Sequence, residues 1–127
     1  MRTRHVTALA MLAGFALGAV AVQSLHAQAK PPVYQIVEID VHNPEAYAKD
    51  YIPIVRPAVI AAGGRFLAEG RVTPFEGEPP KSGVIVQQWD SIEKLQAWRH
   101  STAFEESRKI GEKYAKFRAF AVEGESP

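Results

Sequence analysis

Three ionisable side chains are the candidates for catalysis, namely His100, Arg65 and Glu38. An imidazole titrates near neutral pH, so His100 could serve as a general base. Arg65 follows two glycines, where a sharp turn could aim its guanidinium group at a carboxylate. A buried Glu38 would have a raised pKa and could transfer protons. Each also has a structural interpretation: a histidine at a helix end, an ion pair at a strand start, and a salt bridge from Glu38 to Arg118.

A second group of candidates is aromatic and could bind a flat apolar ligand. We expect Tyr47, Tyr51, Trp98 and Phe104 to form this ligand-binding set. Aromatic residues at helical spacing also pack in cores, so the alternative is that these four rings only fill the interior.

Other kinds of site find no support in the sequence. There is no cysteine, and His42 with Glu45 supplies only two ligands, so we expect no metal site. Fifteen basic and 14 acidic residues give a net charge of +1, which offers no reason to expect nucleic acid as a partner. A glycine-rich phosphate loop and a serine-hydrolase motif are also absent, and we expect no cofactor.

The first 29 residues have the pattern of a secretory signal peptide. Arg2 and Arg4 precede an uncharged apolar run over 6–22, and Ala27-Gln28-Ala29 follows as a cleavage site. Cleavage after Ala29 is the first choice and after Ala27 the second. A retained membrane anchor is the alternative, although the run is slightly short for a span. We therefore expect residues 30–127 to fold in the periplasm or outside the cell, without stable membrane association.

Hydrophobic periodicity and turn residues predict six main elements in the order β-α-β-β-α-β. They are a strand over 33–41, a helix from 44 to about 62, strands over 65–72 and 83–89, a helix opened by Asp90 with a break near Ser101-Thr102, and a strand over 117–122. This order predicts an α+β, ferredoxin-like fold in which two helices cover one face of an antiparallel sheet.

Within the first helix, two prolines and the apolar pattern make specific predictions. Pro53 and Pro57 each remove a helix hydrogen bond, so we expect a kink or a break. Ile54 is expected to face the sheet together with the neighbouring apolar residues of the pattern. The other face of the sheet is also apolar in places. A domain of about 98 residues should bury such a face, so we expect a homodimer closed sheet to sheet as a dimeric α/β barrel.

Several short motifs occur in an order that is typical of one family. They are Asn43-Pro44-Glu45-Ala46-Tyr47, Gly63-Gly64-Arg65, Glu76-Gly77, Trp98 with Ser101 and Phe104, and Val122-Glu123-Gly124. In this order the chain resembles the DUF1330 proteins of the dimeric α/β-barrel superfamily. The resemblance implies a small-molecule pocket between sheet and helices, because the superfamily includes cofactor-independent monooxygenases, muconolactone isomerases and haem-handling enzymes.

Two hypotheses for function follow. The first is an exported homodimer that binds an unknown small organic ligand and catalyses cofactor-independent proton transfer or oxygenation. The second is a non-catalytic dimeric binding or assembly module. An enzyme should have ionisable side chains directed into a cavity, whereas a module should have its pocket filled by Trp98 and Tyr47.

Overall fold

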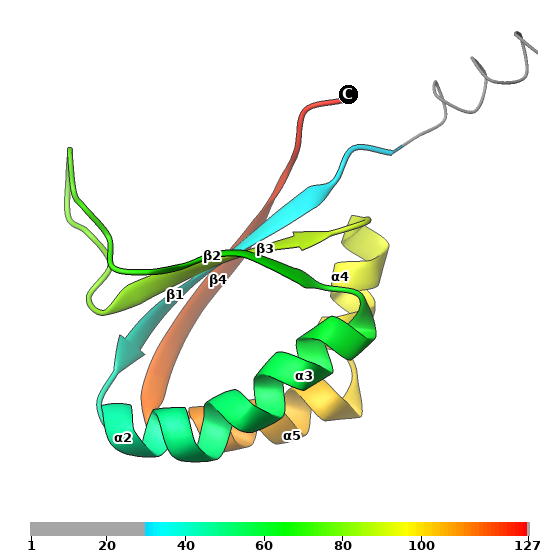
Figure 1. Cartoon of the computed structure of the whole chain (residues 1–127). Coiled ribbons are helices and arrows are strands. Elements are labelled where there is room, and N and C mark those ends of the chain that lie inside the picture. Colours follow the sequence, from blue (N-terminus) through cyan, green and yellow to red (C-terminus); the bar gives the residue numbers. More distant parts are fainter. Residues whose placement is uncertain (1–29, 127) are drawn as a thin grey trace, which may run out of the picture. The chain divides into compact units, whose positions relative to one another are not determined.

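The computed structural model describes residues 30–126, and the predicted signal peptide lies outside this part of the chain. Residues 31–126 form a four-stranded antiparallel sheet with the strand order β2-β3-β1-β4. The helices all lie on one side of this sheet (Figure 1). The predicted α+β, ferredoxin-like fold is therefore confirmed. None of the helices described in 30–126 is long and apolar enough to cross a membrane.

The register of the strands decides which side chains meet the helices. β1 (Val33–Val41) pairs with β3 (Gly83–Trp89) on one side and with β4 (Ala115–Glu123) on the other. Alternate residues of a strand point to opposite faces, so directly paired residues share a face. Val33, Gln35, Val37 and Ile39 are buried and define the helix-covered face.

Two strand boundaries differ from the prediction. β2 (Arg65–Gly70) ends before Val72, because its pairing with β3 stops at the Gly70–Val84 pair, next to the start of β3 at Gly83. β4 begins earlier and ends later than 117–122, because it pairs along the full length of β1. The long β2–β3 loop projects away from the sheet (Figure 1).

The first helical segment is divided by a π-helical turn. α2 (Pro44–Ala46) is capped by Asn43, the π-helical turn covers Tyr47–Tyr51, and α3 (Ile52–Ala62) contains Pro57. The predicted break therefore takes the form of a π turn just before Pro53. This turn shifts the helical phase. Ile54 consequently faces outward, with 48% of its surface exposed, and its predicted place against the sheet is wrong.

The second helical segment breaks where predicted, but the cap of its first helix differs from the prediction. α4 (Ile92–Arg99) is capped by Ser91, whose hydroxyl accepts from the Lys94 N–H at 3.2 Å. The prediction of Asp90 as the cap was wrong by one residue, and the reason is that the extended backbone at Ser91 brings its own hydroxyl to the helix end. α5 (Thr102–Gly111) is capped by Ser101.

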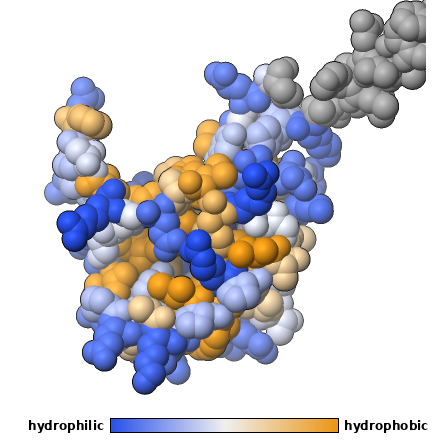
Figure 2. Space-filling view, viewed as in Figure 1, coloured by the Kyte–Doolittle hydropathy of each residue, from blue (hydrophilic) through white to orange (hydrophobic). Residues whose placement is uncertain are grey.

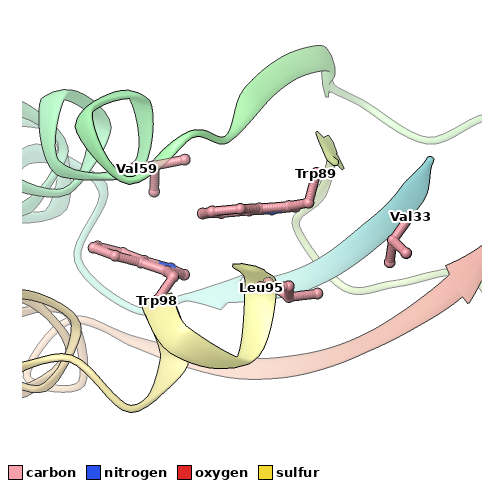
Figure 3. Packing of buried hydrophobic residues seen from close by; sticks show 5 residues of the cluster. All are labelled: Val33, Val59, Trp89, Leu95 and Trp98. Atoms are coloured by element: carbon pink, nitrogen blue, oxygen red, sulfur yellow. The ribbon is translucent and has the colours of Figure 1, made fainter. Parts of the chain in front are cut away.

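Two hydrophobic clusters join the helices to the sheet. In the first cluster, Trp89 and Trp98 stack with their ring centres 6.4 Å apart, between Val59 and Leu95 (Figure 3). The second contains Tyr47, Tyr51 and the β1 and β4 residues near them. Since the two clusters lie at different ends of the helix-covered face, the space between them is where a ligand could be held.

Candidate functional site

A cavity lies between the sheet and the helices, where the two clusters adjoin. The cavity volume is about 50 Å³, and the space that includes the open solvent at its mouth is about 550 Å³. Figure 2 shows apolar and strongly hydrophilic residues interleaved on the face in view, between the sheet and α3. The lining comes from all layers of the fold and includes Gln35, Val37, Ile39, Tyr47, Tyr51, Val55, Arg56, Phe66, Glu69, Ile85, Gln87, Trp98, Arg99, Phe104, Arg108 and Phe117.

Aromatic rings form much of the wall. Tyr47 and Tyr51 have ring centres 5.1 Å apart, and the Tyr51 ring lies 5.6 Å from that of Phe117. Trp98 meets Phe104 edge to face at 5.6 Å. Such pairs keep flat surfaces in fixed orientations, which suits a planar apolar ligand.

Local helix geometry places these rings. The spacing of four residues between Tyr47 and Tyr51 falls within the π turn, and both side chains are buried against the sheet. The Ser101 hydroxyl donates to the Trp98 carbonyl at 2.6 Å and accepts from the Phe104 N–H at 3.2 Å. One serine therefore bonds to the last turn of α4 and caps α5, and it fixes the corner from which Trp98 and Phe104 reach the cavity.

A chain of hydrogen bonds crosses the sheet beneath the cavity. The Gln87 side-chain oxygen accepts from the Gln35 amide at 2.8 Å and from the Trp89 indole N–H at 3.1 Å. The Gln35 oxygen in turn accepts from Arg99 at 3.3 Å. Both glutamines are buried, and buried amides are tolerated when they are paired in this way. The chain therefore holds the Arg99 guanidinium group toward the cavity.

Three arginines line the cavity, and only one of them meets a carboxylate. Arg56 pairs with Glu69 at 2.6 Å. Arg99 and Arg108 lie over the Phe104 ring, at 4.6 and 4.9 Å from its centre, and Arg108 also covers Phe117 at 3.9 Å. Among residues 30–126, neither has a carboxylate within salt-bridge distance. The buried Arg108 Nε has no hydrogen-bond partner there either.

Burial changes the ionisation of several lining groups. Desolvation raises the pKa of Tyr47, and the neighbouring Tyr51 adds to the effect. Desolvation also raises the pKa of Tyr51, although Arg108 opposes it. Burial, followed by the positive charge of Arg108, lowers the pKa of Arg99. At neutral pH both tyrosines are therefore uncharged hydroxyl groups, and two cations are held together in a half-buried place.

The predicted ligand-binding residues are brought together. Tyr47, Tyr51, Trp98 and Phe104 all line this one cavity. Their binding role stays a prediction, but their convergence from two helical segments is a property of the fold.

The three predicted catalytic residues lie apart from the cavity and from one another. His100 is exposed at the end of α4. Glu38 and Arg118 are paired across β1 and β4, 3.2 Å apart, on the sheet face away from the helices. Arg65 begins β2 on that same face. Its strand partner is Gln88 on β3, so it does not lie beside Glu38. The structure thus gives these three residues no common site.

Six polar lining residues were not among the predicted site residues, namely Gln35, Arg56, Glu69, Gln87, Arg99 and Arg108. Gln35 and Gln87 interrupt apolar runs at positions on the buried face, which is the sequence signal that could have revealed them. Arg108 follows Phe104 by four residues, so both fall on one face of α5. Arg99 gave no such signal, because its approach to Gln35 depends on where α4 ends. No group of three metal-ligating acidic, histidine or cysteine side chains occurs in the described part of the chain.

Comparison with known proteins identifies relatives of this fold. The sequence profile of the family described as "Domain of unknown function (DUF1330)" matches residues 32–125. No curated protein matches the chain significantly.

Several solved structures share the fold at low sequence identity. The RPA0582 protein of unknown function from Rhodopseudomonas palustris is 15% identical, with 84% of this chain and 94% of that one aligned at a TM-score of 0.61. SnoaB, a cofactor-independent oxygenase from Streptomyces nogalater, is 11% identical in sequence. The alignment covers 76% of this chain and 96% of SnoaB, at a TM-score of 0.57. PA3566 from Pseudomonas aeruginosa is 14% identical in sequence. The alignment covers 77% of this chain and 98% of PA3566, at a TM-score of 0.54. These likenesses show a common fold.

Proposed function

The chain belongs to the DUF1330 family, and on that premise we propose that it binds a small, flat organic molecule in the cavity between sheet and helices. The observation that carries this proposal is the convergence of four aromatic side chains with separate polar groups on one hollow. Ligand sites are typically apolar clefts with a few polar groups that fix orientation. A filled core would not leave this hollow, which favours binding over pure packing.

The cavity supports binding better than acid–base catalysis. Among residues 30–126, no histidine lines it, and the lining carboxylate of Glu69 is already paired with Arg56. Tyr47 and Tyr51 keep their protons at neutral pH, because burial raises the pKa of both. The groups available to a ligand are therefore hydrogen-bond donors and cations rather than a general base.

Titration with 2-naphthamide, a neutral flat molecule, tests this proposal. The chain has two tryptophans, so its indole N–H groups give two signals in a proton–nitrogen NMR spectrum. We expect the Trp98 signal to shift on binding. Val55→Phe should abolish the shift because Val55 lines the cavity, whereas Ile60→Phe should not, because Ile60 is 58% exposed on α3. An unchanged wild-type spectrum across a panel of flat aromatic amides would refute the binding proposal.

A second candidate is cofactor-independent oxygenation, and the two guanidinium groups favour it. Cations beside a bound ketone stabilise its enolate, which can react with O₂ directly. The ketone gives up an α-proton to solvent water, the enolate carbon bonds to O₂, and the terminal peroxide oxygen takes a proton back from water. The resulting hydroperoxide loses water and leaves a carbonyl. A methylene and O₂ thus become a carbonyl and water. We expect oxygen uptake with 2-tetralone that Arg99→Met lowers and Arg118→Met does not. Uptake at the uncatalysed rate would contradict this candidate.

We also propose that the protein is an exported homodimer. The sheet face away from the helices carries Ile36 and Val86, half-buried, and Phe120 and Val122, which are 47% and 53% exposed. A second copy packed on this face would remove these side chains from water. Sedimentation velocity should show a dimer for the wild type, a monomer for Phe120→Glu, and a dimer for the control Ile60→Glu.

Detection of the mature chain beginning near residue 30 in the periplasmic fraction would support export. An uncleaved chain in the membrane fraction would argue against export.

A further inference from the structure

The charges around the cavity are not balanced by the residues described in 30–126. Arg56 is neutralised by Glu69, but Arg99 and Arg108 are not. Each lies within 5 Å of the centre of the Phe104 ring, so the two cations contact the same side chain. Holding like charges together away from bulk water costs free energy, and an anion between them would offset that cost.

The hydrogen-bond donors of this pair are also incompletely used. Arg108 Nε is buried and has no partner in the described chain. Nε–H and an adjacent terminal N–H form the edge of a guanidinium group that binds both oxygens of a carboxylate. Arg99 donates one bond to Gln35, which orients it and leaves its remaining N–H groups for a ligand.

The surroundings of the two cations are flat and apolar. Phe104 and Phe117 lie directly against the guanidinium groups, and Tyr51 lies beside Arg108. A ligand whose oxygens reach the arginines would therefore place the rest of its body among aromatic rings. Tyr51, protonated at neutral pH, can donate a hydrogen bond to such an oxygen and adds no competing negative charge.

From these contacts we infer that the ligand is an aromatic carboxylate, with its oxygens bound between Arg99 and Arg108 and its ring in the aromatic part of the cavity. This inference rests on the proposed binding function and adds the chemical class of the ligand. Gln35 and Gln87 act as positioning residues, because they hold Arg99 and do not themselves need to touch the ligand.

A matched pair of probes tests the charge preference. 2-Naphthoate and 2-naphthamide share one ring system and differ in charge. Hydrogen bonds to charged groups contribute about 1.5–3 kcal/mol, so the acid should bind about tenfold to a hundredfold more tightly than the amide. Arg99→Met and Arg108→Met should each remove most of this preference while amide binding persists. Arg118→Met removes the same charge from the opposite sheet face and should leave the preference unchanged.

The possible results separate this inference from the binding proposal. Equal affinity for acid and amide, with both blocked by Val55→Phe, would overturn the carboxylate inference and leave the binding site intact. Failure of both probes to bind would overturn both proposals. An equal loss of preference in Arg118→Met would show that general attraction, not the pair, selects the acid. Arg108 packs on two rings, so the fold of each variant has to be checked by circular dichroism. If Arg108→Met does not fold, the result for Arg99→Met decides the test.

Discussion

Replacement of Gly111 by alanine tests whether the Tyr51 ring is tightly confined. A Cβ at this position would lie 2.7 Å from Tyr51 Cε2 and 2.9 Å from two other ring atoms. Ordinary carbon contacts are about 3.5 Å or more, so the ring must move by about 0.8 Å. Tyr51 is only 4% exposed and is packed between Tyr47 and Phe117, so it cannot retreat into solvent. The free direction is the cavity.

Two opposing effects set the magnitude. Overpacking a well-filled core costs about 1–3 kcal/mol. Alanine is about 0.8–1.0 kcal/mol better than glycine inside a helix, and somewhat less at Gly111 because this residue is the last of α5. We therefore expect Gly111→Ala to lower the free energy of unfolding by about 1 kcal/mol, measured by urea denaturation. The displaced ring should also weaken 2-naphthamide binding.

A second background makes the cause identifiable. In Tyr51→Leu the ring is gone, so Gly111→Ala should there become neutral or stabilising, through helix propensity alone. A reversal of sign between the two backgrounds supports confinement of the ring. If Gly111→Ala costs the same in both, the contact with Tyr51 is not the cause and the reasoning is refuted.

Three further predictions concern caps, the buried hydrogen bonds and pH. Ser101→Ala should lower the free energy of unfolding by about 1 kcal/mol because it removes the α5 cap, while Asp90→Ala should change it by less than about 0.5 kcal/mol. A larger loss for Asp90→Ala than for Ser101→Ala in urea denaturation would contradict the observed caps. Gln87→Leu leaves the indole N–H of Trp89 unpaired and should cost about 1–3 kcal/mol, with that indole signal shifted in NMR spectra; an unchanged signal would argue against the bond. Because burial raises the folded-state pKa of Tyr47 above its ordinary 10.0, its contribution to stability is complete below pH 10 and is lost as the pH rises further. Thermal unfolding from pH 8 to 11 should show a smaller decline in Tyr47→Phe than in the wild type, and identical profiles would refute this.

Much of the fold could be predicted from local patterns. Alternation of apolar residues located β1 to the residue, because a strand with one buried face repeats every two positions. β3 was also located to the residue, as a short strand that follows the proline-rich loop. The prolines correctly indicated a disruption of the first helix. They could not indicate a π turn, whose extra residue per turn rotated Ile54 outward, since this depends on how Tyr47 and Tyr51 pack on the sheet.

The candidate site was only partly predictable. The aromatic residues were found because rings at helical spacing mark an apolar helix face, and the structure places all four in the cavity wall. The arginines were not found, because nothing local distinguishes Arg99 from an exposed basic residue. Residues such as Glu38 and Arg65 looked equally suited to chemistry, yet strand register places both on the face away from the cavity.

The sequence by itself determined the order of elements, the fold class and the set of aromatic residues, because these follow from periodicity and turn chemistry within short windows. Only the tertiary structure decided which charges meet. Arg99 reaches Gln35 from a position 64 residues away, and Arg56 pairs with Glu69 while Arg108 stays without a carboxylate. Such pairings depend on strand register and helix phase, where a shift of one residue carries a side chain to the other face.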